Sequence, residues 1–557
     1  MIQQKEPLDC DVLIIGGGIA GLNAAVSAAD HGADVIVAEK ANTLRSGSGA
    51  TGNDHFQCYI PEVHGGDISP VMREMDESLV GGCLDSNLTY KFLTLSEACV
   101  RDWDSWGIDM RPSGGFEFTG HAMPGRPRIF LKYAGHNQKK VLTEQAKKRG
   151  ARILNRTIQT EIIMEEGRVA GSLCVDISEE EPQIQVIRCK SLILATGNTS
   201  RLYSPLSGGL MFNRAHCPAC TGNGRAAAYR IGARLVNLDM AYAHAGPKYF
   251  NRCGKATWIG VYRDLNGNPV GQFVTKPTKE LGDITGDVWG GIFGYKFSQG
   301  EPVYMDCSET APEDLAYMKW GLTEEGNTSL LDHMAKEGID LTKHMVEFCQ
   351  YEPMLIGRGV EIDEYAATNI PGLYAAGDET GNFRADIAAG AVYGRVAGES
   401  AAGYARTAGG TGRAEGSETV KRCADFYSEL LGRDPGDGYA TWFEANVALG
   451  QIMSDYAGME VRSGRLFRAG LIYLRRLQQK LRDTLGCRNS HDFMRCMEVM
   501  DLAQLGELLM LCADERKESR GRNKRVDFPF SNPLNNNRFL MIEQKDGEHV
   551  LTWRDKR

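Results

Sequence analysis

Long hydrophobic runs are missing from this chain, and their absence excludes one class of protein. No stretch of about 18 consecutive apolar residues occurs, whereas a membrane-spanning helix needs about 20. The segment before Asp11 is polar, and the apolar core of a secretory signal peptide is missing from it. We therefore expect a protein that does not span a membrane and that resides in the cytoplasm.

An excess of positive charge is missing as well. The 63 lysines and arginines are outnumbered by 72 aspartates and glutamates, which gives a formal net charge of −9. Proteins that bind nucleic acid usually carry a basic surface that neutralises phosphates. The composition therefore argues against a nucleic-acid partner.

Closely spaced cysteines are rare, although the chain has 15 cysteines in all. Their scattered positions suit reduced thiols better than a disulfide framework. Only Cys217 and Cys220 form a C-x-x-C pair, and no second pair completes a four-thiolate metal site. We expect no metal, and the pair is either a dithiol or part of the packed interior.

Residues 11–40 contain the strongest pattern of the chain: an apolar run, a glycine turn, an alanine-rich helix and a second apolar run. Gly16, Gly18 and Gly21 match the G-x-G-x-x-G fingerprint of a dinucleotide-binding βαβ unit. The three glycines would serve, in order, the tight turn, the close approach of a pyrophosphate and the helix–strand packing. Glu39 ends the second run, where it can accept a hydrogen bond from a ribose hydroxyl. The alternative is a glycine turn that only packs.

Later segments return the chain to the same nucleotide. A small, polar, glycine-rich loop follows Lys40, and it is suited either to wrap a cofactor or to be a flexible surface loop. The N-terminal position of the fingerprint favours FAD over NAD. The residues expected to contact the cofactor are Gly16, Gly18, Gly21, Glu39, Lys40, Ser46, Gly47, Gly52, Ala195, Thr196, Gly197, Asn223, Gly377, Asp378 and Ala388.

Taken in order, these motifs resemble the flavoprotein subunits of the fumarate reductase and succinate dehydrogenase superfamily, which includes L-aspartate oxidase. The resemblance covers nearly the whole chain, and Arg45-Ser46-Gly47 resembles the branch of the adenylylsulfate reductase alpha subunit in particular. It implies an α/β fold with a glutathione-reductase-like FAD domain in two sequence blocks. The implied domains are residues 1–245 and 351–410 for FAD, 246–350 for an inserted capping domain, and 417–557 for a C-terminal helical domain.

Two departures from the family pattern change the expected chemistry. Relatives with covalent flavin carry a histidine in the glycine loop, where this chain has Leu44-Arg45-Ser46, so we expect non-covalent FAD. Fumarate reductases carry a proton-delivering arginine in the cap, but no arginine occurs between Asp264 and Gly300. We therefore expect neither fumarate reduction nor succinate oxidation, and a true adenylylsulfate reductase is doubtful for the same reason.

Three residues are expected to act on the substrate. The resemblance implies this role for His244 and Arg384, and Arg358 stands where relatives place a second substrate histidine. Guanidinium groups bind carboxylates and sulfonates bidentately, so the two arginines would clamp an anion. The simpler alternatives are surface ion pairs for the arginines and a hydrogen-bonded core position for the histidine.

The sequence thus predicts a FAD-dependent oxidoreductase acting on a small anionic metabolite. Only one complete dinucleotide fingerprint is present, so electrons are expected to pass through a separate iron–sulfur, ferredoxin-like protein, as the resemblance implies. The chain is expected to be part of a hetero- or homo-oligomer. The alternatives are an electron-relay subunit of a larger redox complex, an adenylylsulfate reductase-like alpha subunit, and an NAD-binding regulator.

Overall fold

The computed structural model describes the chain except for residues 78–83, 120–124, 206–210, 249–257, 271–295, 297–298, 413, 460 and 522. Its centre is a sheet in the order β6-β3-β2-β9-β8-β7, with β1 (Gln3–Gln4) and β16 (Leu373–Ala375) also paired to β9. Strands β6 (Arg152–Asn155), β3 (Val35–Glu39), β2 (Leu8–Ile15) and β9 (Gln183–Leu194) run parallel. Strands β7 (Thr157–Glu165) and β8 (Arg168–Asp176) extend the sheet as an antiparallel meander.

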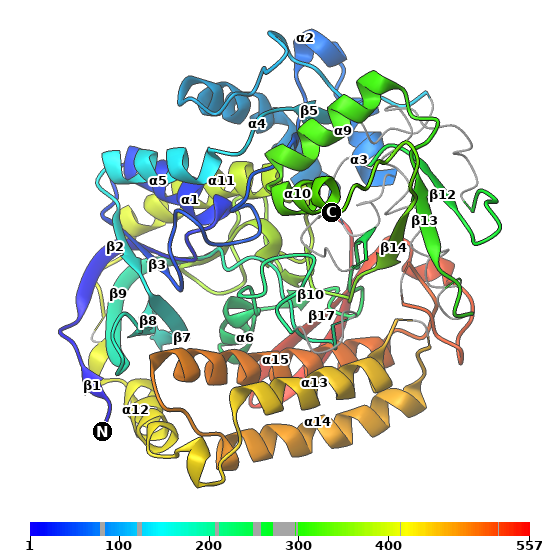
Figure 1. Ribbon diagram of the computed structural model, residues 1–557. Helices are drawn as coiled ribbons and strands as arrows, with labels where there is room; N and C mark the ends of the chain where they lie inside the picture. Colours follow the sequence, from blue (N-terminus) through cyan, green and yellow to red (C-terminus); the bar gives the residue numbers. More distant parts are fainter. Residues whose placement is uncertain are drawn as a thin grey trace.

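Two helices pack closely over this sheet because small residues line their contact (Figure 1). These are α1 (Ile19–Asp30) and α11 (Asp386–Thr407), with α5 (Gln138–Lys148) beside α1. A Cβ atom on Gly394 would lie 2.4 Å from the Ala20 carbonyl oxygen, and one on Gly398 would lie 2.4 Å from that of Ala24. The glycines therefore let the two backbones touch, and both helices begin at the same edge of the sheet.

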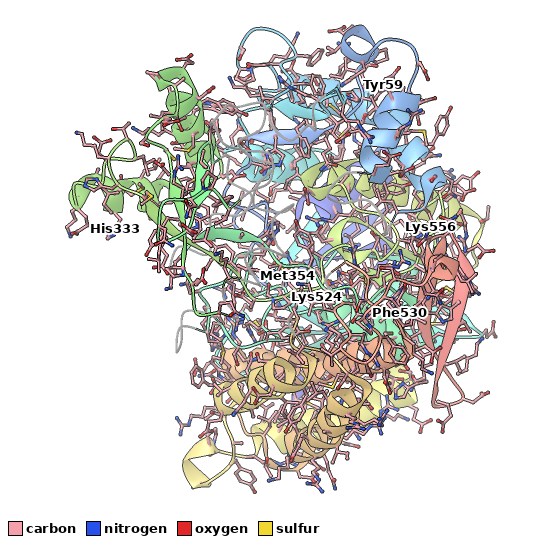
Figure 2. The ribbon with its side chains drawn as sticks, turned by 90° about the vertical axis from the view of Figure 1, so that its right-hand side faces the viewer. Tyr59, His333, Met354, Lys524, Phe530 and Lys556 are labelled. Carbon is pink, nitrogen blue, oxygen red and sulfur yellow. The ribbon has the colours of Figure 1, made fainter. Side chains whose placement is uncertain are left out.

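The inserted cap has a core of its own. Strands β11 (Ala245–Pro247), β14 (Val346–Gln350), β13 (Val303–Asp306) and β12 (Val261–Arg263) form an antiparallel sheet. Helices α9 (Pro312–Glu324) and α10 (Thr328–Lys336) complete its described part. Figure 2 shows the cap, with His333, on the side of the molecule opposite Lys556. The core of this unit is built from Trp258, Tyr262, Val303, Met305, Met318 and Phe348, among others.

The C-terminal region is helical only in its first part, which corrects the prediction of a helical domain over residues 417–557. Helices α12 (Glu418–Leu431), α13 (Trp442–Ala457), α14 (Gly464–Thr484) and α15 (Ser490–Glu515) form a layer below the nucleotide domain (Figure 1). The chain then forms a hairpin of β17 (Arg538–Lys545) and β18 (Glu548–Asp555). Asp546 and Gly547 have positive φ values of 51° and 82°, as a two-residue hairpin turn requires.

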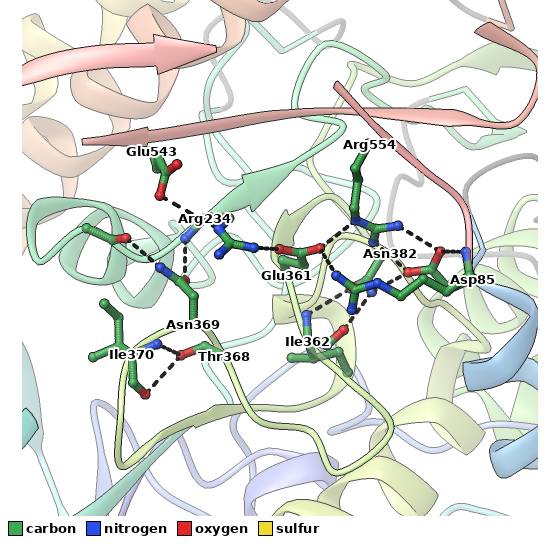
Figure 3. A network of polar contacts seen from close by, with 12 residues as sticks. Asp85, Arg234, Glu361, Ile362, Thr368, Asn369, Ile370, Asn382, Glu543 and Arg554 are labelled. Atoms are coloured by element: carbon green, nitrogen blue, oxygen red, sulfur yellow. Dashed lines mark hydrogen bonds and ion pairs between the residues drawn. The ribbon is translucent and has the colours of Figure 1, made fainter. Parts of the chain in front are cut away.

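This hairpin joins the body of the protein rather than the helices alone. Strand β17 pairs with β10 (Leu235–Val236), which pairs with β15 (Gly359–Val360). Figure 3 shows the polar network at this joint, in which Arg554 donates to Asp85 Oδ2 at 2.6 Å and to Glu361 Oε1 at 2.5 Å. Asn382 also donates to Asp85 at 2.8 Å, so the hairpin braces the segment that leads to Arg384.

Among the helices of the described residues, none combines the length and the apolar character that are needed to cross a membrane.

Candidate functional site

A cavity of about 470 Å³ opens at the edge where the parallel strands end. Gly16 follows β2, Glu39 ends β3, Ala195 follows β9, and Gly377 lies just beyond β16. Ligands of open α/β sheets bind at this edge, beyond the carboxyl ends of the strands. Thirteen of the fifteen residues expected to contact the cofactor line this cavity; the other two, Gly21 and Ala388, lie behind it.

The fingerprint glycines differ in what surrounds them. A Cβ atom on Gly16 would lie 2.4 Å from the Ala195 carbonyl oxygen, and one on Gly21 would lie 1.8 Å from that of Gly16. Gly18 instead has no atom within 4 Å of such a Cβ, because it faces the cavity. Gly16 and Gly21 are therefore required by packing, whereas Gly18 leaves open a cradle for a ligand.

The cavity wall offers the donors that a pyrophosphate needs. Helix α1 begins at this wall, and its N-cap Gly18 provides no side chain to satisfy the first N–H groups. Ser46 also lines the cavity, and its buried Oγ has no hydrogen-bond partner among the described residues. The residues present therefore fit a flavin dinucleotide, for which Gly18 and Ser46 would offer hydrogen-bond donors.

Glu39 and Lys40 sit at the nucleotide end of the cavity, but they make different contacts. Glu39 accepts from the backbone N–H groups of Gly17 at 2.6 Å and of Ala41 at 2.7 Å, and its carboxylate has lone pairs left for a ribose. The Lys40 ammonium donates to Glu498 Oε1 of α15 at 2.8 Å. Lys40 thus contributes to the cavity wall, while its ammonium group forms an ion pair with the Glu498 carboxylate.

Two buried, positively charged side chains close to the cavity were not predicted as site residues. Lys139 of α5 donates to the Gly17 carbonyl, and burial lowers the pKa of this lysine to about 8. Arg225 of α6 (Asn223–Arg230) donates to the carbonyl oxygens of Gly197 at 2.6 Å and Arg358 at 2.8 Å. No feature of the sequence distinguishes either residue from the many surface lysines and arginines of the chain.

Arg225 has a buried acidic partner, Glu379, which is also unpredicted. Their charged groups lie 3.9 Å apart, and both side chains are fully buried. Glu379 accepts from the backbone N–H of Thr196 at 2.8 Å and from the hydroxyl of the same residue. The ion pair therefore holds Ala195–Gly197, which line the cavity, in place through hydrogen bonds to their backbone. Beside it, burial raises the pKa of Asp378 to about 6.

At the far end of the cavity, His244 lies against two rings. Its ring stacks on His216 with centroids 4.8 Å apart, and it meets Tyr242 edge-to-face at 4.8 Å. Both histidines line the cavity. His216 was missed, because nothing in its sequence neighbourhood indicates that it would stack on His244.

The two predicted substrate arginines lie behind this wall. The Arg384 guanidinium lies 4.2 Å from the Tyr242 ring centroid and donates to Asp386 Oδ1 at 2.8 Å. Arg358 donates to the carbonyl oxygens of Met240 at 2.9 Å and Gly357 at 2.7 Å. Neither arginine is among the residues that line the cavity, whereas Asp386 is. The anion clamp stays a prediction.

A cluster of two acidic residues and one histidine lies at the same cavity, and its histidine and one of its acids line it. Oxygen and nitrogen atoms of Asp54, His55 and Glu325 lie within 4.8 Å of one another, and all three residues are buried. The His55 Nδ1 and an Asp54 carboxylate oxygen are 2.5 Å apart. Glu325 comes from the end of the cap helix α9, so cap and FAD domain meet here. These groups are of the kind that binds a cation, so the expected absence of a metal stays a prediction.

The cap segment without an arginine, Asp264 to Gly300, lies mostly outside the described residues. A contact from the cap to the cavity is nevertheless visible. A Cβ atom on Gly52 would lie 2.0 Å from the Glu324 carbonyl oxygen at the end of α9. The glycine loop is thus held closely between the cap and the cavity.

Comparisons with known proteins agree with this geometry. The model of an FAD binding domain matches residues 11–261, and that of the fumarate reductase flavoprotein C-terminus matches residues 446–556. One chain of the fumarate reductase (CoM/CoB) of Methanothermobacter marburgensis is 26% identical, over 95% of this chain and 96% of its own. An L-aspartate oxidase of Yersinia pestis is 23% identical, over 93% of this chain and 96% of its own.

A solved structure shows the same fold over the full length. Adenylylsulfate reductase from Archaeoglobus fulgidus aligns with a TM-score of 0.85 and 20% identity, over 100% of this chain and 96% of that chain. The order of the motifs, the cavity at the strand ends and the two matched domains lead to one conclusion. The chain is an FAD-dependent oxidoreductase related to the fumarate reductase flavoprotein subunits and the L-aspartate oxidases.

Proposed function

We propose that this protein oxidises or reduces a small anionic metabolite, with FAD held non-covalently. The observation that carries the proposal is the cluster in which His244 of the cavity wall contacts Tyr242, and Tyr242 in turn contacts Arg384 behind the wall. A cation, an imidazole and a phenol ring together suit a carboxylate or sulfonate group. FAD supplies the electron-transfer chemistry when it is bound.

The local electrostatics support an anion at this end. Helix α11 begins at Asp386, and Asp386, Ile387 and Gly390 of its first turns line the cavity. Unpaired N–H groups of a helix N-terminus attract negative charge. The Asp386 carboxylate accepts a hydrogen bond from the Arg384 guanidinium, so a substrate anion would share this cation or displace Asp386 from it. His244 would orient the anion from the cavity wall.

Arg358 is the weaker member of the proposed clamp. Its donors serve two backbone carbonyl groups, and its own carbonyl oxygen accepts from Arg225. A direct role in substrate binding would require its side chain to leave these partners. Its replacement is therefore the natural comparison for replacement of Arg384.

We further propose that electrons reach or leave the flavin through a separate iron–sulfur protein. The chain carries one dinucleotide fingerprint, and a relative is named as one subunit of a larger enzyme. An electron-relay subunit without a substrate of its own is the alternative. A relay would be re-oxidised by protein partners only, whereas the proposed enzyme, once photoreduced without oxygen, is re-oxidised by a small carboxylate or sulfonate.

The test replaces Arg384 by Lys and follows this re-oxidation by a panel of such anions. Loss of one charge-assisted pair in a partly desolvated site should cost about 2–4 kcal/mol, or roughly 30- to 1,000-fold in rate. FAD content should not change. Arg111→Lys, at an exposed position, is the control. Full activity of the Arg384 variant, or loss of its FAD, would show that Arg384 serves the fold or the cofactor instead.

A further inference from the structure

One wall of the cavity is a single short segment that the proposed function does not use. Six consecutive residues, 215–220, all line the cavity. At one end of the segment His216 stacks on His244, and at the other the Lys40 ammonium donates to the carbonyl of Ala219. The segment therefore extends from the proposed substrate end of the cavity to its nucleotide end, and it contains the C-x-x-C pair.

The backbone holds the two cysteines of this pair close together. The N–H of Cys220 donates to the carbonyl oxygen of Cys217 at 3.1 Å, which closes a turn with Pro218 at its second position. Such turns keep the first and fourth Cα atoms within about 7 Å, and disulfides join Cα atoms about 4.4–6.8 Å apart. A disulfide between Cys217 and Cys220 is thus compatible with the turn as it stands.

The side chains and charges around the pair favour thiol chemistry. Cys217 shares a side-chain hydrogen bond with Cys220, and this contact and burial raise the pKa of Cys220, while Lys40 opposes the rise. Cys217 is the more exposed of the two thiols. A thiolate on Cys217 would be stabilised by the Cys220 S–H and by the ammonium groups of Lys40 and Lys139, which are the surroundings of reactive cysteines.

We propose that Cys217 and Cys220 form a redox pair that exchanges two electrons with the FAD bound in this cavity. In one direction the two S–H bonds break and one S–S bond forms, and two electrons and two protons pass to oxidised FAD. In the other direction reduced FAD returns them and the disulfide opens. The pair would give the protein a second store for two electrons beside the flavin. The inference rests on FAD binding and is independent of the substrate.

The chain contains a matched control for this pair. Cys487 and Cys496 also share a side-chain hydrogen bond, which raises the pKa of Cys496. They are buried among the C-terminal helices, where their thiols also face the carbonyl oxygens of Leu430 and Gly486, and neither lines the cavity. Proximity of two thiols is thus common to both pairs, whereas a position at the cavity belongs to Cys217 and Cys220 and not to Cys487 and Cys496.

The experiment uses the full-length protein loaded with FAD. It is oxidised with diamide, freed of reagent, and illuminated without oxygen in the presence of EDTA, which donates electrons to the light-excited flavin and does not itself reduce disulfides. Thiols are then trapped with N-ethylmaleimide in denaturant and mapped by mass spectrometry. One tryptic peptide, residues 215–225, contains both cysteines. We expect it to carry a disulfide before illumination and two alkyl groups afterwards, and to remain a disulfide in illuminated protein from which FAD has been removed.

Counting electrons gives an independent measurement. Oxidised wild-type protein should take up about twice as many electrons per FAD as Cys220→Ser, whereas Cys496→Ser should match the wild type. The FAD content of each variant, measured after release by acid, confirms that the variants are loaded. The proposal is wrong if the peptide stays disulfide-bonded when the flavin is reduced, if no disulfide forms with diamide, or if the pair retains a metal ion. Equal electron uptake by wild type and Cys220→Ser also overturns it.

Discussion

Replacement of Arg225 by Met tests the central claim about how the cavity wall is held. Arg225 is fully buried, and its guanidinium donates to the carbonyl oxygens of Gly197 and Arg358 and faces the buried Glu379 carboxylate at 3.9 Å. Methionine removes the charge while it keeps a long apolar side chain. It therefore leaves three backbone carbonyl groups, those of Gly197, Arg358 and Asp378, and one carboxylate without their cationic partner.

The expected loss of stability is large for a single substitution. Breaking a buried ion pair by removing one partner costs about 3–5 kcal/mol, because the remaining charge is left uncompensated. Each unpaired buried carbonyl adds about 1–3 kcal/mol unless water reaches it. We therefore expect Arg225→Met to lower the free energy of unfolding by at least about 3 kcal/mol. The double variant with Glu379→Gln should recover part of the loss, because the orphaned charge is gone.

The assay is urea unfolding followed by circular dichroism, with FAD at one fixed excess in every sample and its Kd measured for each variant, so that the contribution of ligand binding can be subtracted. Arg101→Met is the control, because Arg101 is exposed and its ion pairs with Glu62 and Glu97 lie on the surface. Its loss should be under about 1 kcal/mol. The reasoning fails if Arg225→Met stays within about 1 kcal/mol of the wild type, or if the double variant is no better than the single one.

Three further outcomes are expected. Gly18→Val should fold but bind no FAD, because its side chain would enter the cavity. Gly21→Val should fail to fold, because its Cβ would overlap the Gly16 carbonyl. Circular dichroism reports whether each variant folds, and flavin absorbance reports whether it binds FAD. Acid precipitation should release all the yellow chromophore, and flavin fluorescence that stays with the polypeptide on a denaturing gel would contradict non-covalent binding. Burial raises the pKa of Asp378 to about 6, so ionisation of this carboxyl at higher pH destabilises the folded state. Asp378→Asn should therefore stabilise the protein by about 1–3 kcal/mol near pH 7 and by much less near pH 4. The same difference at both pH values, measured against Asp332→Asn on the surface, would contradict this.

The sequence predicted those parts of the site that depend on backbone conformation. Gly16 and Gly47 have φ values of 101° and 81°, which favour glycine over residues with side chains, so their pattern is visible without a structure. The order of the strand-ending motifs likewise predicted which segments meet at the cavity. These features depend on residues that are neighbours in the sequence, so rules on local sequence patterns can predict them.

The parts that could not be predicted depend on contacts between distant segments. Arg225 and Glu379 are 154 positions apart, and each would pass for a surface residue in its own segment. His216 gains meaning only when it stacks on His244. The C-terminal hairpin is a different case, because the Asp546–Gly547 turn between two alternating runs is a local signal, and the helical interpretation overlooked it.

The cofactor site also depends on residues far beyond the matched FAD binding domain. Glu498 of α15 is buried and accepts from Lys40 at 2.8 Å and from Arg201 and Arg495 at 2.8 Å each. Burial alone would raise the pKa of Glu498, but the three cations together lower it, so this carboxylate is charged and binds them. Lys40 in turn holds the carbonyl of Ala219, between Cys217 and Cys220, in the cavity wall. Because the wall and α15 share this buried charge, FAD binding and the packing of the C-terminal helices should stabilise each other.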